Sequence, residues 1–236
     1  MLNQSNYELK RNKKHFSGLL WTNIIVHFSF LIFFSLVGRF DSSESQTILN
    51  SSTGVMALAT TVTFSVAVVY GVVLFNRLLL NHYIKQAREK TYLFPGGRLS
   101  IFWGKVCALC TYFVFNFFPV VLFENFIFYF IVNASGFAMI SFLSYVFKVV
   151  LIVIFSTLFS LAIILLSQLF GQILQSSNTS VVASVILVSV VGNFVALLYQ
   201  INNFIIILII LITLVILTII SKILANRIQK DDVIEG

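Results

Sequence analysis

Charged residues are scarce in this sequence, at 10% of its 236 positions, whereas a soluble globular domain carries about 25%. The chain is 59% hydrophobic, with a mean hydropathy of +1.01. Its 2 prolines and 11 glycines fit neither a fibrous nor a low-complexity protein. These deficits exclude an ordinary soluble domain and indicate an integral membrane protein.

Motifs that carry chemistry are also missing. The two cysteines, Cys107 and Cys110, lie in an apolar stretch without the two further ligands that a zinc site requires, so we expect ordinary membrane-helix cysteines and no metal site. We find no HExxH motif, no Gly-x4-Gly-Lys-Ser/Thr phosphate loop and no Ser-His-Asp arrangement. We therefore expect no enzyme activity and no cofactor bound by this chain.

Six apolar stretches approach or exceed the length of about 20 residues that crossing a bilayer requires. A polar break at 199–203 divides the last two, which would otherwise form one helix about 60 Å long, twice the thickness of the hydrocarbon. The sequence therefore predicts an all-α, polytopic membrane protein with six transmembrane helices. The predicted spans are Phe16–Gly38, Gly54–Asn76, Val106–Ile131, Leu143–Phe170, Val181–Gln200 and Asn203–Ser221.

Basic residues are unevenly distributed between the two sides that these spans define. Of the 15 lysines and arginines, 13 lie before the first span, in the connection 77–105 or after the last span. The first outer connection holds only Arg39, and the third connection holds none. By the positive-inside rule both termini are cytoplasmic in a multi-pass protein of the plasma membrane. The formal charge of +7 is thereby explained without a nucleic-acid partner.

This topology predicts a cytoplasmic tail at 1–15, a six-helix transmembrane domain at 16–221 and a second cytoplasmic tail at 222–236. Within the domain, small residues form stripes on three spans, because they recur at helical spacing. Such stripes let helices approach closely, so we favour packing within the chain, although a substrate path or a subunit interface would use the same residues. They comprise Thr53, Ala57, Thr60, Ala67 and Gly71; Ser156, Ser160, Ser167 and Gly171; and Ser189, Gly192, Ala196 and Gln200.

Four polar or charged residues within the spans are candidate functional residues, because such side chains are costly in a bilayer. Asn23 and His27 are four positions apart and so share a helix face. Glu124 and Lys148 lie near the outer ends of antiparallel spans, which predicts an ion pair. The alternatives are that His27 only holds helices together by hydrogen bonds, that Lys148 snorkels to the surface, and that Glu124 reaches the headgroups.

The cytoplasmic connection 77–105 is the longest segment outside the membrane. A charged helix-forming run is followed by apolar and aromatic residues and then by the stop Pro95-Gly96-Gly97. Exposed aromatics beside a turn are suited to anchoring a soluble partner, although a helix lying on the bilayer surface would have a similar pattern.

With its six spans, basic leading tail and Arg-Glu-x-Thr-Tyr-Leu-x-Pro-Gly loop, the chain resembles the permeases of ABC-2 type ATP-binding cassette exporters. Those of Gram-positive lantibiotic-immunity and toxin-peptide exporters look most similar. The resemblance implies a coupling helix that docks on a separate ATPase subunit, which binds the ATP and magnesium, and an amphipathic elbow helix at Tyr7–Phe16. The implied coupling residues are Arg88, Glu89, Thr91, Tyr92, Leu93, Phe94 and Pro95.

The resemblance further implies a dimer with a second permease copy or a homologous permease, two ATPase subunits, and an amphipathic or hydrophobic peptide as cargo. The mostly apolar spans agree with such a cargo, because a small hydrophilic ion needs a more polar lining. Two alternatives remain open: a six-helix substrate-capture subunit of an uptake system, and a membrane-embedded enzyme. Copurification with an ATPase through the loop would favour the permease, and the missing catalytic motifs disfavour the enzyme.

Overall fold

The computed structural model of the chain describes residues 2–40, 52–84, 98–134 and 142–230, with side chains described at 17–38, 52–84, 99–132 and 142–229. Every regular element in these ranges is helical, because a backbone in hydrocarbon must satisfy its own hydrogen bonds. The elements are α1 (Leu2–Phe40), α2 (Ser52–Leu78), the 3₁₀ helix η2 (Leu80–His82), α4 (Arg98–Ala134), α5 (Phe142–Ile173), α6 (Ser177–Val191), α7 (Asn193–Leu197) and α8 (Asn203–Lys230).

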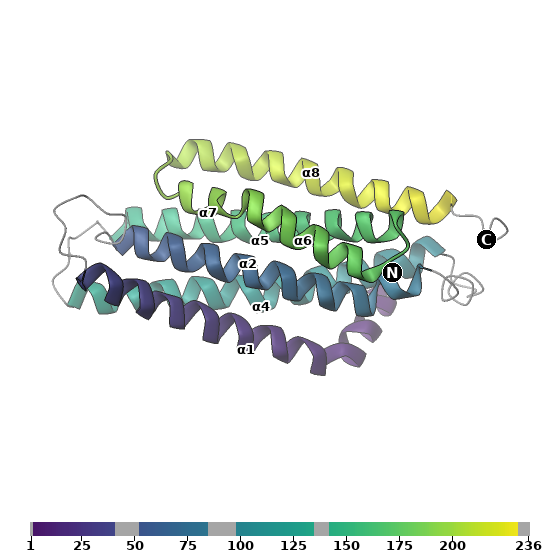
Figure 1. Cartoon of the computed structure of the whole chain (residues 1–236), viewed down its shortest axis with the longest axis horizontal. Coiled ribbons are helices and arrows are strands. Elements are labelled where there is room, and N and C mark those ends of the chain that lie inside the picture. The colour runs from purple at the N-terminus through teal and green to yellow at the C-terminus, as the bar shows by residue number, and fades with distance from the viewer. Residues whose placement is uncertain (1, 41–51, 85–97, 135–141, 231–236) are drawn as a thin grey trace.

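The prediction of six membrane-spanning helices is confirmed by length and composition. The helices long and apolar enough to cross a bilayer cover Ser17–Gly38, Ser52–His82, Leu99–Val132, Phe142–Ile173, Ser177–Leu197 and Asn203–Gln229. They lie side by side along the long axis of the molecule, and the start of α1 and the end of α8 are at the same end (Figure 1). Which end faces the cytoplasm stays a prediction from the charge distribution.

Several helices extend beyond the predicted spans, and α8, for example, continues to Lys230 rather than ending near Ser221. The third helix begins at Arg98 rather than near Val106, because a helix can continue past the hydrocarbon where its residues still pack, as the fully buried Phe102 does. The fifth span is interrupted at Gly192, between α6 and α7. A hydropathy profile predicts neither the extended helix ends nor the turn at Gly192, because it detects only the length of an apolar stretch.

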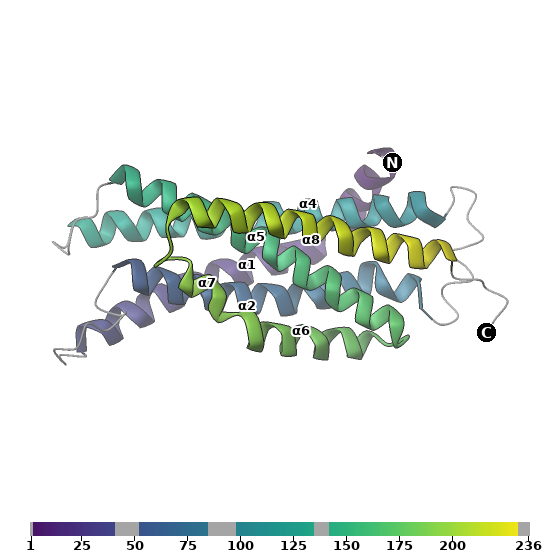
Figure 2. The same ribbon diagram turned by 90° about the horizontal axis from the view of Figure 1, so that it is seen from above.

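The helices α2 and α5 form the centre of the bundle. Of their apolar windows 61% and 72% are buried, against 17% for α1 and 22% for both α6 and α8. The two central helices contact each other, and α1 and α4 cover one side while α6 and α8 cover the other (Figures 1 and 2). The outer helices turn large apolar side chains outward, as a lipid-facing surface requires.

Small residues line the contacts of the central helices. On α2, Ala57, Thr60 and Ala67 are at most 2% exposed, and on α5, Ser156, Ser160 and Ser167 are fully buried. Each of the three serines donates its hydroxyl to the backbone of its own helix, so these hydroxyls are satisfied without a partner on another helix. These two stripes therefore serve packing within the chain, whereas Ser189 and Gln200 of the third stripe are exposed.

The α5–α6 turn lies at the same end of the bundle as the two chain termini (Figure 1). Its backbone forms a Schellman motif, in which Ser176 N–H donates to Gly171 O at 2.9 Å and Gln175 N–H to Gln172 O at 3.4 Å. Gln175 has a φ of 50°, in the left-handed region that glycine usually occupies. Across this turn, Asn76 on α2 donates to Ser177 O at 2.9 Å and accepts from the Ser180 hydroxyl at 2.6 Å.

The first turns of α1 lie at an angle to the rest of that helix and project away from the bundle (Figure 2). They include Tyr7–Phe16, for which the resemblance implies an elbow helix, and they belong to a single helix with the first span. The role of this segment as an elbow stays a prediction.

Substitution of Gly171 by leucine tests the tightness of the α5–α6 contact. A Cβ at Gly171 would lie 2.6 Å from Leu80 Cδ2 and 2.8 Å from Ser180 Cβ, which is too close without a shift of the helices. We expect Gly171→Leu to lower the free energy of unfolding in mixed micelles by about 1–3 kcal/mol. Ile173→Leu, on the same turn but 42% exposed, should change it by less than about 0.5 kcal/mol. Equal stability of the two variants would contradict the packing.

The topology is tested by labelling single cysteines in a Cys107→Ala/Cys110→Ala background. Cysteines at positions 45 and 138 should react with an impermeant maleimide in intact cells, because their connections carry almost no basic residues. Cysteines at positions 90 and 230 should react only after permeabilisation. If position 90 were labelled in intact cells, the loop would lie outside and the predicted orientation would be wrong.

Candidate functional site

Asn23 and His27 share the buried face of α1, as their spacing predicted, and both are 0% exposed. The Asn23 amide donates to Asn116 O on α4 at 3.2 Å. The His27 Nδ1 atom lies 2.9 Å from Thr63 Oγ1 on α2. Because Thr63 itself donates to Ala59 O at 2.8 Å, its oxygen accepts from His27, which assigns the proton to Nδ1. These contacts join α1 to both of its neighbours.

Several polar atoms in this layer have no hydrogen-bond partner. They are His27 Nε2, Asn23 Oδ1 and both side-chain atoms of Asn125, a fully buried residue of α4 that adjoins His27. In the Nδ1–H tautomer, His27 Nε2 is an acceptor and the Asn125 amide offers it a donor. The layer is therefore best explained as a polar contact that holds helices together through Asn23 and His27.

Glu124 lies at a groove between α1 and α4. It is 7% exposed, and its Oε2 atom has no hydrogen-bond partner. It borders a depression of about 800 Å³ together with Phe28, Phe118 and Phe123, and a smaller one of about 260 Å³ farther along the same two helices. Among the described residues, this carboxyl is the only ionisable group that lines either depression.

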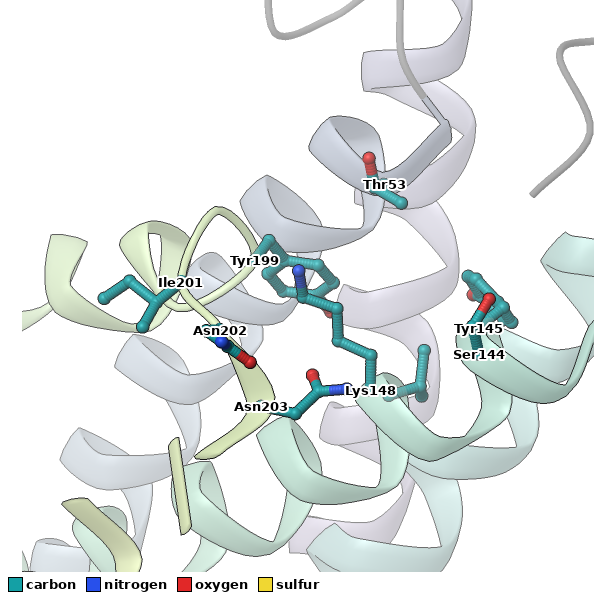
Figure 3. A pocket seen from close by; sticks show the side chains of 9 residues that line it. Thr53, Ser144, Tyr145, Lys148, Tyr199, Ile201, Asn202 and Asn203 are labelled. Atoms are coloured by element: carbon teal, nitrogen blue, oxygen red, sulfur yellow. The ribbon is translucent and has the colours of Figure 1, made fainter. Parts of the chain in front are cut away.

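Lys148 borders a different cavity, of about 390 Å³, at the end of the bundle opposite the chain termini. Figure 3 shows its side chain extending from α5 towards the α7–α8 turn, which carries Tyr199, Asn202 and Asn203. Thr53 of α2 and Ser144 of α5 complete the polar lining.

Tyr199 forms one wall of this cavity and lies in the connection between the last two spans. Its hydroxyl lies 3.3 Å from Thr60 Oγ1 on α2. Burial raises the pKa of Tyr199 to about 12, and the hydrogen bond from Thr60 opposes that shift only in part. The phenol therefore keeps its proton at physiological pH.

The predicted ion pair between Glu124 and Lys148 does not form. The two side chains border separate depressions, and neither makes an ion pair with another described residue. The rise per residue correctly places both near the same end of the bundle, but it says nothing about the direction in which each side chain leaves its helix. The pairing hypothesis failed because packing sets that direction.

The seven coupling candidates, Arg88, Glu89, Thr91, Tyr92, Leu93, Phe94 and Pro95, lie outside the described residues, so their role stays a prediction. The described residues on either side of that segment are in contact. Tyr83, which is 1% exposed, packs edge to face against Phe102, with ring centroids 6.0 Å apart and an interplanar angle of 85°. We call this contact between Tyr83 and Phe102 the base of the 85–97 segment, because it joins the end of α2 to the start of α4.

Four polar partners were not singled out from the sequence: Thr63, Asn116, Asn125 and Tyr199. The two asparagines carried a usable signal, since amides are costly within an apolar span. Thr63 and Tyr199 carried none, because threonine is common in membrane helices and tyrosine at their ends. Their roles depend on contacts with helices distant in the sequence.

Within the described part of the chain, no group of three or more His, Cys, Asp or Glu side chains is placed to hold a metal ion. Cys107 and Cys110 are both free thiols. No protein-family model, curated protein or solved structure matches the chain. What the fold defines is therefore a class, a multi-pass α-helical membrane protein.

Two double-mutant cycles on the free energy of unfolding test these placements. His27→Leu and Thr63→Val should be coupled by about 0.6 kcal/mol and by at most about 1.7 kcal/mol, the range for side-chain hydrogen bonds between membrane helices. Glu124→Gln and Lys148→Gln should be additive, because their side chains border separate depressions. Coupling between the two charges, or additivity at His27 and Thr63, would contradict the arrangement.

Proposed function

We propose that this membrane protein is the permease subunit of an ATP-binding cassette exporter of the ABC-2 type. In this proposal it moves amphipathic or hydrophobic peptides across or out of the plasma membrane. It acts as a dimer, with a second copy or a homologous permease, and ATPase subunits on separate chains supply the energy. The ATP and magnesium are bound by those subunits.

The groove at Glu124 is the observation that carries the transport proposal. An ionisable side chain within a membrane is a functional candidate by default, because burying it costs free energy that only a role would justify. Glu124 has no partner among the described residues and borders an apolar depression of about 800 Å³ on the side of the bundle. A groove of aromatic and aliphatic side chains with a single polar group suits an amphipathic cargo that arrives from the lipid.

The base of the 85–97 segment supports coupling to a partner. A partner that changes shape can move membrane helices only through a mechanical contact. Because Tyr83 and Phe102 pack against each other at that base, a force on the segment reaches α2 and α4 together. Of these two, α2 is a central helix of the bundle, so its displacement would be felt by most of the other spans.

The dimer proposal rests on the resemblance and on the outer faces of the bundle. Large apolar side chains are exposed along α1, α6 and α8, for example Val190 at 75% and Leu211 at 56%. Such faces are covered either by lipid or by a second permease.

Replacing the aromatics of the loop tests the coupling. Tyr92→Ala combined with Phe94→Ala should leave the protein inserted and folded, because neither residue lies in a predicted span. Recovery of the ATPase subunit in a pull-down should fall by an amount that corresponds to a few kcal/mol, the scale of aromatic interface anchors. Transport, and any ATPase activity that the cargo stimulates, should be lost with it.

A matched control removes the same kind of side chain from the lipid-facing surface. Phe115 and Phe130 on α4 are 72% and 60% exposed and line neither depression at Glu124, so Phe115→Ala combined with Phe130→Ala deletes two aromatic rings outside the loop and outside the groove. This control should leave ATPase recovery unchanged. If the loop variant also recovers the ATPase fully and transports normally, the segment rests on the bilayer and the coupling assignment is wrong.

A further inference from the structure

The cavity around Lys148 is lined by one cation and several neutral polar groups. None of the described residues that line it is a carboxylate, and Lys148 makes no ion pair with any of the described residues. Asn202 and Asn203 reach the cavity from the α7–α8 turn, and Figure 3 shows them beside the lysine side chain. A cation surrounded by amide and hydroxyl groups is suited to an anion that accepts several hydrogen bonds at once.

Three helices begin at this cavity. Thr53 is in the first turn of α2, Ser144 in the first turn of α5, and Asn203 is the first residue of α8. A helix N-terminus carries a partial positive charge. No acidic residue occurs in the first turn of α2 or α5, and α8 begins Asn-Phe-Ile-Ile. The helix ends therefore add to the positive potential of Lys148.

The depth of the cavity places it at the boundary between water and hydrocarbon. Lys148 is six residues beyond the start of α5, or about 9 Å along the helix. Tyr145 and Tyr199 line the cavity, and tyrosine is typical of the headgroup layer. Beside the cavity, Leu143, Phe147 and Phe204 are 81%, 50% and 74% exposed. A ligand held at Lys148 would thus lie next to apolar surface that acyl chains can cover.

We propose that this cavity binds the phosphate of an anionic phospholipid, with the acyl chains against the exposed faces of α5 and α8. Lys148 supplies the charge, and Asn203 supplies an amide donor. The adjoining apolar surface distinguishes a lipid from a free phosphate, which would gain nothing from it. This site is separate from the groove at Glu124 and does not depend on the proposed transport function.

A tryptophan reporter tests the site in vesicles. Phe147→Trp is introduced in a Trp21→Phe/Trp103→Phe background, and quenching is measured with brominated phosphatidylglycerol or brominated phosphatidylcholine. The reporter should prefer phosphatidylglycerol about fivefold, the effect of one lysine near a charged membrane surface. Lys148→Gln should bring the preference close to one, and Lys148→Arg should retain it.

Two further variants and one competitor complete the test. Asn203→Asp places a carboxylate beside Lys148 and should abolish the preference even if Lys148→Gln fails to fold. Lys222→Gln, an exposed lysine on α8 outside the cavity, should leave the preference unchanged. A preference that survives Lys148→Gln would overturn the proposal. Displacement of the brominated lipid by millimolar glycerol 3-phosphate would overturn the lipid assignment in favour of a free phosphate.

Discussion

The burial of α2 and α5 at the centre of the bundle is the constraint on which the rest of the structure depends. Lipid tails are as apolar as the side chains, so burial of apolar area does not drive these helices together, and they must gain their stability from close packing. Small residues buried along α2 and α5, including Ala57, Ala67 and the back-bonded Ser156, let neighbouring helices approach closely. The four outer helices pack against this central pair, and the shape of the central surfaces limits the positions that the outer helices can take.

The same constraint explains where the polar residues lie. A polar side chain inside the bundle must find a partner, as His27 does at Thr63 and Asn76 does at Ser180, and it then fixes the relative positions of two helices. An ionisable side chain that finds no hydrogen-bond partner in the centre of the bundle lies instead beside a surface depression. Glu124 and Lys148 border separate depressions of the bundle, which keeps the two charges apart.

The sequence was sufficient to predict features that depend on one helix at a time. Hydropathy predicted six spans, and helical spacing predicted that Asn23 and His27 share a face, which is buried. It was insufficient where two helices must be placed around each other. Axial rise gave similar heights for Glu124 and Lys148, but the side from which each emerges depends on packing. The Lys148 cavity was out of reach for the same reason, because its walls come from three elements distant in the sequence.

The two ends of the bundle differ in a way that bears on mechanism. At the end that carries the termini, the α5–α6 turn is closed by a Schellman motif, α6 is tied to α2 through Asn76, and Tyr83 packs on Phe102. At the opposite end, a turn at Gly192 divides the fifth span into α6 and α7, and residues at the starts of α2, α5 and α8 line a cavity. Under the proposed coupling to a partner, a displacement applied at the tied end would move α2, α4 and α6 together, because these contacts join them. The cavity at the opposite end would then give the helices room to separate.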